Sequence, residues 1–429
     1  MTHDEDQRIR QMFESASEAA ESGRGQYAEQ LLRQAEAEAP DHPLVRNQVA
    51  SRMIVAGNLQ GAQAMLEQAV KADPSNKALW LNLASALRGM GRADEEMAAL
   101  DHVLGLEPYH MRALMQKASL HEIRNEPREA AMTYRTALRI IPEGFEPPPH
   151  MRPVLQHAKE AVEANDRALE VYLEDRLKGI RERHKDERQD GFDRCLATLL
   201  RKRRIFGQQP TFMYFPRLPA IEFHDRDDFP WLDSIEAAAD DIREELLNVL
   251  ADGPEVLTPY VSHPEGAAGR FRELNNSRRW GTYFLWREGV AFPDHLARCP
   301  RTVKALEAWP RCDVPGSAPS CVFSILDAKT HIPAHSGVSN TRLLVHLPLI
   351  VPPGCVFRCG AETREWVPGK ALIFDDTIEH EVWNDSDEPR AVMIFDIWSP
   401  CLSAAERDLV RETTTAVGEY YGIRTYDGD

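Results

Sequence analysis

The sequence predicts a two-part α plus β protein, in which a helical solenoid precedes an antiparallel β domain of sandwich or jelly-roll type. Three observations carry this prediction. A repeat with a period of 34 residues fills the first third of the chain, and a proline-rich segment interrupts it. Short β-prone runs separated by turn residues such as "VPGK" and "NDSDEP" fill the last half.

The repeat consists of three columns of residues with the same spacing. The prolines are Pro40, Pro74, Pro108 and Pro142. The small or apolar residues are Ala35, Ala69, Val103 and Ala137. The turn residues are Gly23, Gly57, Gly91 and Asn125. Gly and Asn tolerate the left-handed backbone at a helix end, small residues permit close helix packing, and proline ends the second helix. The period resembles the tetratricopeptide repeat, so residues 7–142 are predicted to form an α-solenoid.

A linker is predicted after the repeats, because "EGFEPPPHMRP" contains three consecutive prolines. We expect residues 143–206 to combine this proline-rich linker with charged connecting helices. A solenoid presents a concave surface to a protein or peptide, or else it only packs against its neighbouring domain. The three columns are packing positions and identify no ligand.

The composition excludes several classes of protein. The 429 residues carry a net charge of −17, whereas nucleic acids and anionic membranes require a basic face. The apolar runs are too short for an integral membrane segment. Seven scattered cysteines indicate a reduced, cytoplasmic protein. The run "CVFRC" has no partner pair elsewhere, which favours two strand residues over half a metal site.

Residues 207–429 are predicted to form the β domain, with a helix at "SIEAAADDIREELLNVL" before most of the strands. In "TRLLVH", Arg342, Leu344 and His346 share one face of a strand because side chains alternate. Burying an unpaired cation is expensive, so this face indicates either a bound anion or an exposed sheet edge. The strand alone leaves both interpretations open.

Two further stretches supply histidines that a metal site could use. "PAHSGVSNTRLLVH" contains His335, and "DDTIEHEVWND" contains His380. In a jelly roll these two histidines can converge, and neutral imidazoles are preferred ligands of Fe(II). A third, carboxylate ligand usually stands two residues after the first histidine, but here that position is Gly337. Either histidine alone is better explained as a structural residue, and it is the pair, each beside a strand that carries an arginine, that favours a metal site.

The combination of these stretches resembles a known family. "HSGVSNTRLLVH", "FDDTIEHEVWN" and a later arginine, in this order, closely resemble the aspartyl/asparaginyl β-hydroxylases. These are dioxygenases that use Fe(II), O2 and 2-oxoglutarate as co-substrate. The resemblance spans about residues 280 to 400, and it implies a double-stranded β-helix (jelly-roll) oxygenase domain. Animal enzymes of this family also carry a repeat array before the oxygenase domain.

The resemblance also implies roles for individual residues. His335 and His380 match the two iron-binding histidines, for which Gly337 in place of a carboxylate is normal. The residues that match the 2-oxoglutarate site are Trp280, Ser324, Val345, His346 and Arg390. A guanidinium such as that of Arg390 can bind a carboxylate with two hydrogen bonds.

One position departs from the family. The animal enzymes carry an active-site arginine where this chain has Leu344. Arg342 lies on the same predicted strand face, and we expect it to compensate if the substrate is held in the same way. Asp375 and Asp376 precede His380, where they either orient the imidazole or cap the end of a strand.

The resemblance predicts hydroxylation of the β-carbon of Asp, Asn or a similar residue in a protein or peptide, with the repeats recruiting that substrate. Two alternatives stay open. The same chemistry could act on a lipid-linked or small-molecule substrate, since relatives of this domain hydroxylate lipid acyl chains. The chain could instead be a protein-binding scaffold whose oxygenase domain is inactive, and Leu344 is the one feature that favours this alternative.

Overall fold

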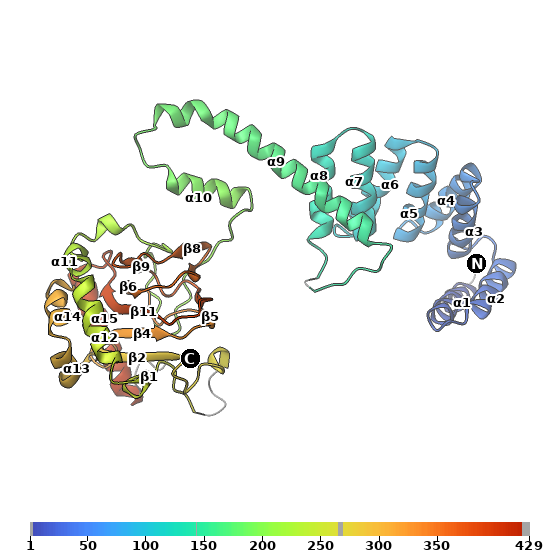
Figure 1. Ribbon diagram of the computed structural model, residues 1–429. Helices are drawn as coiled ribbons and strands as arrows, with labels where there is room; N and C mark the ends of the chain where they lie inside the picture. Colours follow the sequence, from blue (N-terminus) through green and yellow to red (C-terminus); the bar gives the residue numbers. More distant parts are fainter. Residues whose placement is uncertain (1–2, 143, 265–268, 423–429) are drawn as a thin grey trace. The chain divides into compact units, whose positions relative to one another are not determined.

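The computed structural model of the protein describes residues 3–142, 144–264 and 269–422. The chain forms two compact units, residues 1–188 and 189–429. Figure 1 shows the helical N-terminal unit in blue to green and the β-rich C-terminal unit in green to red.

The N-terminal unit is an array of antiparallel helix pairs, as the repeat predicts. Its helices are α1 (His3–Glu21), α2 (Gly25–Glu38), α3 (Pro43–Val55), α4 (Leu59–Ala72), α5 (Lys77–Gly89), α6 (Ala93–Leu106), α7 (Met111–Ile123), α8 (Pro127–Leu138) and α9 (Arg152–Arg183). The helices of each pair are in extensive contact, as are α8 and α9. The prediction of a helical solenoid is therefore confirmed.

The three repeat columns have the structural roles that their residue types predict. The turn residues of the four repeats all have positive φ, from 60° at Asn125 to 81° at Gly57. The small residues of the second helices are completely buried: Ala35, Ala69, Val103 and Ala137. The prolines follow the ends of α2, α4, α6 and α8. Local backbone requirements and close packing thus explain the period.

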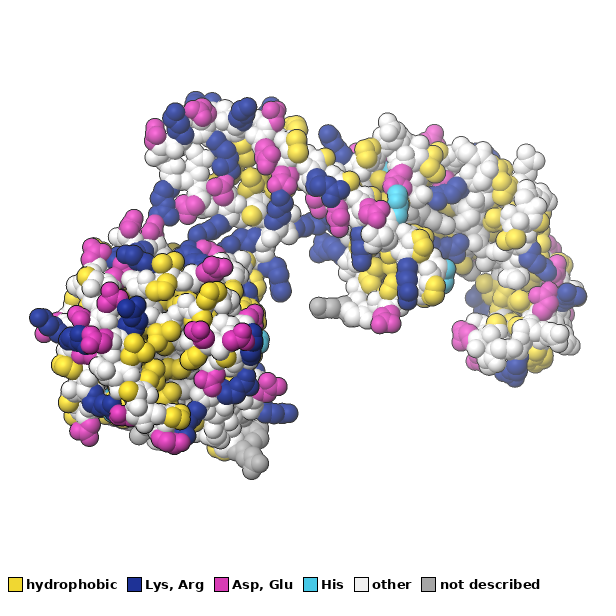
Figure 2. All heavy atoms as spheres, viewed as in Figure 1, with side chains coloured by type: hydrophobic (Ala, Val, Ile, Leu, Met, Phe, Trp, Pro, Cys, Tyr) yellow, Lys and Arg dark blue, Asp and Glu magenta, His cyan; other side chains and the backbone are white. Residues whose placement is uncertain are grey.

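The helices that follow the repeats are divided between the two units. α9 packs its first turns against α8, where Ala158 shares a core with Ala130 and Tyr134. The rest of α9 is mostly exposed, and Figure 2 shows charged side chains of both signs interspersed along it. α10 (Asp190–Leu199) belongs to the C-terminal unit.

The C-terminal unit contains two antiparallel sheets. Its strands are β1 (Thr258–Pro259), β2 (Trp280–Arg287), β3 (Val290–Ala291), β4 (Cys321–Leu326), β5 (Thr330–His335), β6 (Arg342–Ile350), β7 (Cys355–Cys359), β8 (Glu362–Glu365), β9 (Leu372–Phe374), β10 (His380–Asn384) and β11 (Arg390–Trp398). The larger sheet has the order β1-β2-β4-β11-β6-β9, with β3 beside β2. The smaller sheet has the order β5-β10-β7-β8.

Helices cover the outer face of the larger sheet. They are α11 (Leu232–Ala237), α12 (Ala239–Leu250), α13 (Pro293–Arg298) and α14 (Pro300–Ala305). The last helix, α15 (Ala404–Tyr421), packs at the end of β11 instead, where Val410 shares a small core with Trp398 and Cys312. Short 3₁₀ turns lie at η1 (Arg226–Asp228), η2 (Pro254–Val256), η3 (Gly269–Phe271) and η4 (Leu306–Ala308). One core joins α11 and α12 to the sheet, for example through Leu246, Phe323 and Val345. A second core joins the two sheets, for example through Phe357, Phe374 and Val392. Two antiparallel sheets around one core are the layers of a jelly-roll sandwich.

The histidine stretch Pro333–His346 does not form one strand. β5 ends at His335 in the smaller sheet, and β6 begins at Arg342 in the larger sheet. β6 lies between β11 and β9, so the interpretation of "TRLLVH" as an exposed sheet edge is wrong. The predicted face is confirmed, because Arg342, Leu344 and His346 all point to the space between the sheets. The chain therefore changes sheet within this stretch.

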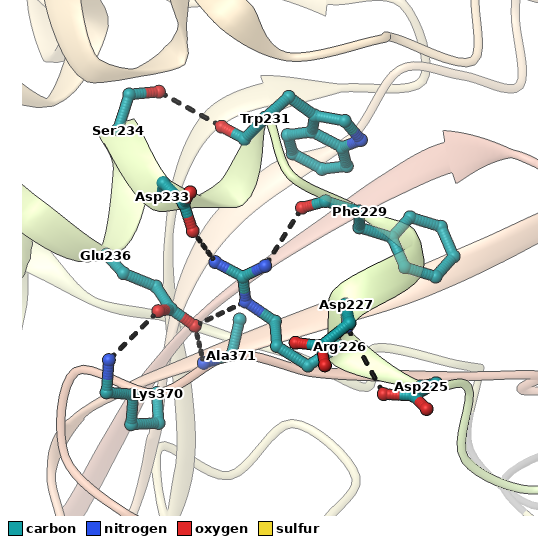
Figure 3. A network of polar contacts seen from close by, with 10 residues as sticks. All are labelled: Asp225, Arg226, Asp227, Phe229, Trp231, Asp233, Ser234, Glu236, Lys370 and Ala371. Atoms are coloured by element: carbon teal, nitrogen blue, oxygen red, sulfur yellow. Dashed lines mark hydrogen bonds and ion pairs between the residues drawn. The ribbon is translucent and has the colours of Figure 1, made fainter. Parts of the chain in front are cut away.

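A polar network fixes α11 against the loop before β9 (Figure 3). Arg226 donates to Glu236 at 2.9 Å and to Asp233 at 2.6 Å. Glu236 also accepts hydrogen bonds from the backbone N–H of Ala371 and from Lys370. Burial alone would raise the pKa of Glu236, but these hydrogen bonds together lower it below its ordinary value. The network holds the helical layer in register with the sheet edge that carries β9.

Candidate functional site

A cavity of about 150 Å³ lies between the two sheets of the C-terminal unit. Strands of both sheets line it, which explains how residues far apart in sequence meet there. The predicted site residues that line it are Trp280, Ser324, His335, Arg342, Leu344, His346, His380 and Arg390. The fold therefore gathers nearly all of the residues that sequence reasoning singled out.

The two predicted metal ligands are cross-strand neighbours. His335 on β5 pairs with His380 on β10, and their ring centroids lie 4.1 Å apart. In each ring Nδ1 faces a backbone carbonyl two residues earlier, that of Pro333 at 2.8 Å and that of Ile378 at 3.0 Å. A carbonyl can only accept, so Nδ1 carries the proton and Nε2 carries the lone pair in both rings. This is the tautomer that a metal ion bound through Nε2 requires.

Both imidazoles are kept neutral by their surroundings. Burial lowers the pKa of His335 to about 4, with a smaller contribution from Arg270. Burial, followed by the neighbouring His335, moves the pKa of His380 well below its ordinary value. Only the neutral form of histidine binds a metal ion, so the donor set suits Fe(II) or a similar ion.

The space beside Gly337, where a carboxylate ligand would usually stand, is occupied by Asp376, which follows the end of β9. A Cβ built on Gly337 would lie 2.0 Å from Oδ2 of Asp376. The backbone N–H of Gly337 also donates to the carbonyl of Asp376 at 2.6 Å. Asp376 lines the cavity, and its Oδ1 has no hydrogen-bond partner among the described residues. The carboxyl group nearest to position 337 therefore comes from Asp376.

Asp375 has a different role from its neighbour. Its Oδ1 accepts hydrogen bonds from the N–H and the hydroxyl of Thr377, and its Oδ2 accepts one from Gln208 at 2.6 Å. These contacts close the turn between β9 and β10, as expected for a carboxylate at a strand end. Asp375 is absent from the cavity wall.

Arg390 is a completely buried cation at the inner end of the cavity. Its Nε and Nη1 have no hydrogen-bond partner within the described ranges. Its guanidinium lies 4.8 Å from the ring centroid of Trp366, and burial lowers its pKa to about 10. Such an arrangement is costly unless an anion joins it, because a buried charge needs a partner. The site fits a carboxylate.

Three of the other residues predicted to contact 2-oxoglutarate line the same cavity as Arg390. Ser324 on β4 is buried, and its Oγ accepts a hydrogen bond from Trp280 Nε1 at 3.1 Å. Burial lowers the pKa of His346 to about 3, and its Nδ1 has no hydrogen-bond partner in the described part of the chain. Trp280 stacks on Tyr260 with ring centroids 4.0 Å apart. Polar atoms that need a partner thus cluster at one end of the cavity.

Arg342 is held between two buried carboxyl groups. It lies 3.4 Å from Asp396 and 3.8 Å from Asp376. Burial raises the pKa of each carboxyl group to about 7, and the arginine opposes this shift. Arg342 already has two carboxyl groups of the protein as neighbours. The bound anion that was predicted for its strand face is therefore better placed beside Arg390, which has none within the described residues.

Val345 is the exception among the predicted site residues. Its side chain points to the core under the helices and does not line the cavity. Sequence reasoning also missed two neighbours of the buried arginines, Asp396 beside Arg342 and Trp366 beside Arg390. Asp396 follows Arg390 at an even spacing on β11, so strand alternation could have found it. Trp366 lies in the loop between β8 and β9, where no local pattern marks it.

No group of three or more His, Cys, Asp or Glu side chains able to hold a metal ion occurs in residues 3–142, 144–264 and 269–422. The candidate metal centre therefore rests on two histidines. Cys355 and Cys359 are buried residues of β7 with free thiols, as the spacing in "CVFRC" predicts.

Comparison with known proteins assigns the C-terminal unit. Residues 236–400 match the family model of the aspartyl/asparaginyl β-hydroxylases. This part of the unit is therefore similar to the aspartyl/asparaginyl β-hydroxylase domain. Residues 54–118 match a tetratricopeptide-repeat model, which agrees with the helix pairs of the N-terminal unit.

Three curated relatives share the hydroxylase domain. Human aspartyl/asparaginyl β-hydroxylase is 38% identical over 136 residues, 31% of this chain and 18% of that protein. An ornithine lipid ester-linked acyl 2-hydroxylase from Rhizobium tropici is 35% identical over 185 residues, 42% of this chain and 62% of that protein. Human aspartate β-hydroxylase domain-containing protein 2 is 30% identical over 205 residues, 47% of this chain and 53% of that protein. The chain thus spans less than two thirds of each of these relatives.

Solved structures match the helical part of the chain. A structure of MamA is 22% identical with a TM-score of 0.25, and the match covers 31% of this chain and 76% of that one.

In the described part of the chain, no helix combines the length and the apolar character needed to cross a membrane.

Proposed function

We propose that the hydroxylase domain is an Fe(II)- and 2-oxoglutarate-dependent dioxygenase that hydroxylates a residue of a protein or peptide. The observation that carries the proposal is Arg390, a buried guanidinium with two unpaired nitrogens in the cavity that holds His335 and His380. A cation in this position needs an anionic ligand, and two neutral imidazoles beside it suit a divalent metal ion. A dicarboxylate that also binds metal meets both requirements.

The two histidines would hold the metal ion through Nε2. Their orientation does not depend on the metal, because Nδ1 of each ring is already bonded to the backbone. Asp376 would accept a hydrogen bond from a group bound beside the histidines, since its Oδ1 is unpaired. Gly337 supports this role because any side chain there would displace the Asp376 carboxyl group.

Arg390 and Ser324 would hold the distal carboxylate of 2-oxoglutarate, and His346 would lie beside the co-substrate. Trp280 positions the Ser324 hydroxyl, because it donates to Oγ and leaves the hydroxyl hydrogen for the ligand. The aromatic rings of Tyr260, Phe271 and Phe374 line the same cavity and exclude water from it. Fe(II) with bound 2-oxoglutarate and O2 supplies the oxidising chemistry, which couples decarboxylation to succinate with hydroxylation of a C–H bond.

The repeats favour a macromolecular substrate. Solenoids of helix pairs offer extended surfaces for proteins and peptides. Human aspartyl/asparaginyl β-hydroxylase is also named for amino-acid residues. We therefore propose that the N-terminal unit recruits a protein that carries the residue to be hydroxylated.

The test is formation of succinate from 2-oxoglutarate by the full-length protein. We expect turnover that requires Fe(II) and is lost in His335→Ala and His380→Ala. His331→Ala is the matched control, because His331 lies on the same strand β5 but is half exposed and pairs with Glu381 outside the cavity. Wild-type protein that binds neither Fe(II) nor 2-oxoglutarate would instead support an inactive domain on a protein-binding scaffold.

A second candidate function keeps the reaction and changes the substrate to a lipid-linked acyl chain. Two observations favour it: Leu344 presents an apolar side chain to the cavity, and one relative is named as an acyl 2-hydroxylase. Mass spectrometry of cells that express the wild type or His335→Ala distinguishes the candidates. An added oxygen on peptides supports the first, and an added oxygen only on lipids supports the second.

A further inference from the structure

A second cavity of about 160 Å³ adjoins the first one along the inner face of the larger sheet. The two cavities share four lining residues: Tyr260, Val261, Leu344 and Ile394. The second cavity continues from the reacting centre toward β2 and the loop before β4, where Phe284 and Ser320 line it. A substrate that reaches the histidines from this side must pass over Leu344.

The passage between the cavities is apolar. Leu344 and Ile394 lie on the neighbouring strands β6 and β11, and Val322 on β4 continues the same surface. Strand alternation turns all three side chains toward the cavity, while Leu343, Val345 and other odd-numbered neighbours enter the helical core. This surface suits the aliphatic part of a substrate.

The cations near the passage are already neutralised. Arg342 lies between Asp376 and Asp396. Arg287, at the outer end of the second cavity, donates to Glu288 at 3.0 Å. Arg390 faces the other end of the first cavity. In the second cavity a substrate carboxylate would therefore meet the buried carboxyl groups of Asp396 and Glu288, while the arginine in the cavity wall, Arg287, is already paired, which is unfavourable.

Asp396 supplies a polar contact at the end of the apolar surface. It is completely buried and lines the second cavity. Its Oδ2 accepts hydrogen bonds from Arg342 and from the backbone N–H of Ser320, whereas its Oδ1 has no partner among the described residues. Asp396 is also the cross-strand neighbour of Leu344. An unpaired acceptor in this place fits a hydrogen-bond donor of the substrate.

The size of the second cavity limits what it can hold. A cavity of about 150 Å³ accommodates a molecule the size of benzene. One amino-acid side chain with a short aliphatic stem fits this volume, but a long acyl chain exceeds it. Size therefore favours a side chain over a lipid tail.

We infer that the second cavity is the subsite for the side chain of the substrate residue, and that this side chain is uncharged with a hydrogen-bond donor at its end, as in a carboxamide. Leu344 disfavours a carboxylate by placing an apolar group beside Asp396, where the nearby arginines, Arg342 and Arg287, are already paired. This inference rests on the proposed function, which supplies the reaction. The preference for one side chain over another can nevertheless be measured by binding alone, without turnover.

The experiment measures binding to the metal-free full-length protein by saturation-transfer NMR at about pH 8, above the pKa of about 7 of Asp396, so that its carboxylate is ionised. The probes are capped pentapeptides with two glycines on each side of a central Asn, Asp or Leu, together with octanoylglycinamide as an acyl probe. We expect the Asn peptide to bind most tightly, the Leu peptide less tightly, and the Asp peptide at least about tenfold more weakly than the Asn peptide.

Variants test the assigned residues. Leu344→Arg introduces a cation beside Asp396 and should reverse the order of the Asn and Asp peptides. Leu344→Met is the matched control, because it keeps an apolar side chain of similar volume and should keep the wild-type order. Asp396→Asn removes the anionic neighbour and should bring the Asp peptide within about threefold of the Asn peptide. If Leu344→Arg does not fold, the order of peptide binding to the wild type and to Asp396→Asn still tests the subsite.

The inference is overturned if the Asp peptide binds as tightly as the Asn peptide, if no peptide binds, or if octanoylglycinamide binds best. An unchanged order in folded Leu344→Arg overturns it as well. Turnover of 2-oxoglutarate is measured separately on the Fe(II)-loaded protein. If the peptides bind in the expected order but no succinate forms, the proposed function is refuted and the subsite stands. If succinate forms but the peptides do not bind in the expected order, only the subsite is refuted.

Discussion

Asp376 occupies the space that a side chain at Gly337 would need, with only 2.0 Å between its Oδ2 and a Cβ built on that glycine. The two residues belong to the segments that follow β5 and β9, and they are joined by a 2.6 Å hydrogen bond between their backbones. Position 337 therefore cannot carry a carboxylate side chain while the buried carboxyl group of Asp376 lies beside it.

Gly337→Ala should destabilise the C-terminal unit by about 1–3 kcal/mol, because the new methyl group overpacks a filled site. In the Asp376→Ala background the same substitution should cost less than about 0.5 kcal/mol. A double-mutant cycle measures the difference between the two costs, which is the coupling of the two residues. Urea unfolding followed by tryptophan fluorescence reports this unit, since every tryptophan except Trp80 lies in residues 189–429. Gly207→Ala is the control, because no atom lies within 4 Å of a Cβ there. Equal costs of Gly337→Ala in both backgrounds would contradict the steric argument.

Arg390→Met should separate stability from co-substrate binding. Without ligand, the variant should be at least as stable as the wild type, because it removes a buried cation that lacks a partner. With Mn(II) and 2-oxoglutarate at about 100 times the Kd, the wild type should gain about 2.7 kcal/mol and the variant almost nothing. Thermal unfolding measures both quantities.

Arg358→Met is the matched control for this prediction. Arg358 on β7 is paired with Glu379 and Glu381 and does not line the cavity. Its removal should lower stability while the response to 2-oxoglutarate stays that of the wild type. A response to 2-oxoglutarate that survives in Arg390→Met would show that another residue binds the distal carboxylate.

Glu245→Ala should destabilise the C-terminal unit by about 2–4 kcal/mol, since it leaves several buried donors unpaired. Glu245 on α12 accepts hydrogen bonds from the N–H groups of Arg301 and Thr302 and from the Thr302 hydroxyl, at 2.7 to 2.8 Å. Its neighbour Glu244 is exposed, so Glu244→Ala should change stability by less than about 0.5 kcal/mol. Urea unfolding compares the two variants.

The wild type should lose stability relative to Asp396→Asn as the pH rises from about 4 to about 7. Burial raises the pKa of Asp396 to about 7 in the folded protein, from an ordinary value of 3.8. Between these values the folded state keeps a proton that the unfolded chain has released, so each rise in pH favours unfolding. The relative loss can reach about 1.4 kcal/mol per pH unit and should stop above about pH 7. Unfolding free energies of both proteins across this range measure the difference, and parallel curves would contradict the prediction.

The parts of the fold that depend on local rules could be predicted from the sequence. Positive φ at Gly57 and Asn125 and the burial of Ala69 follow from turn geometry and helix packing, which the repeat records directly. Strand alternation likewise placed Arg342 and His346 on one face. These features need only the properties of neighbouring residues.

The features that were missed depend on contacts between distant segments. The change of sheet between His335 and Arg342 follows from pairing with β10 and β11, which a single sequence does not record. The same holds for the position of Trp366 beside Arg390, and for the pairing of Asp396 with Arg342, although strand alternation alone could have placed Asp396 on the inner face. Partners of buried charges were therefore harder to predict than the charges themselves.

The hydrogen bonds from Nδ1 of His335 and His380 to backbone carbonyls have a consequence for how this domain diverges. The orientation of both imidazoles depends on no other side chain, because a carbonyl two residues earlier is present whatever residue stands there. Substitutions in the surrounding wall, such as leucine at position 344, can therefore accumulate without disturbing the metal-binding geometry. A domain built in this way can change the residues of its cavity wall while the geometry of its histidine pair is inherited unchanged.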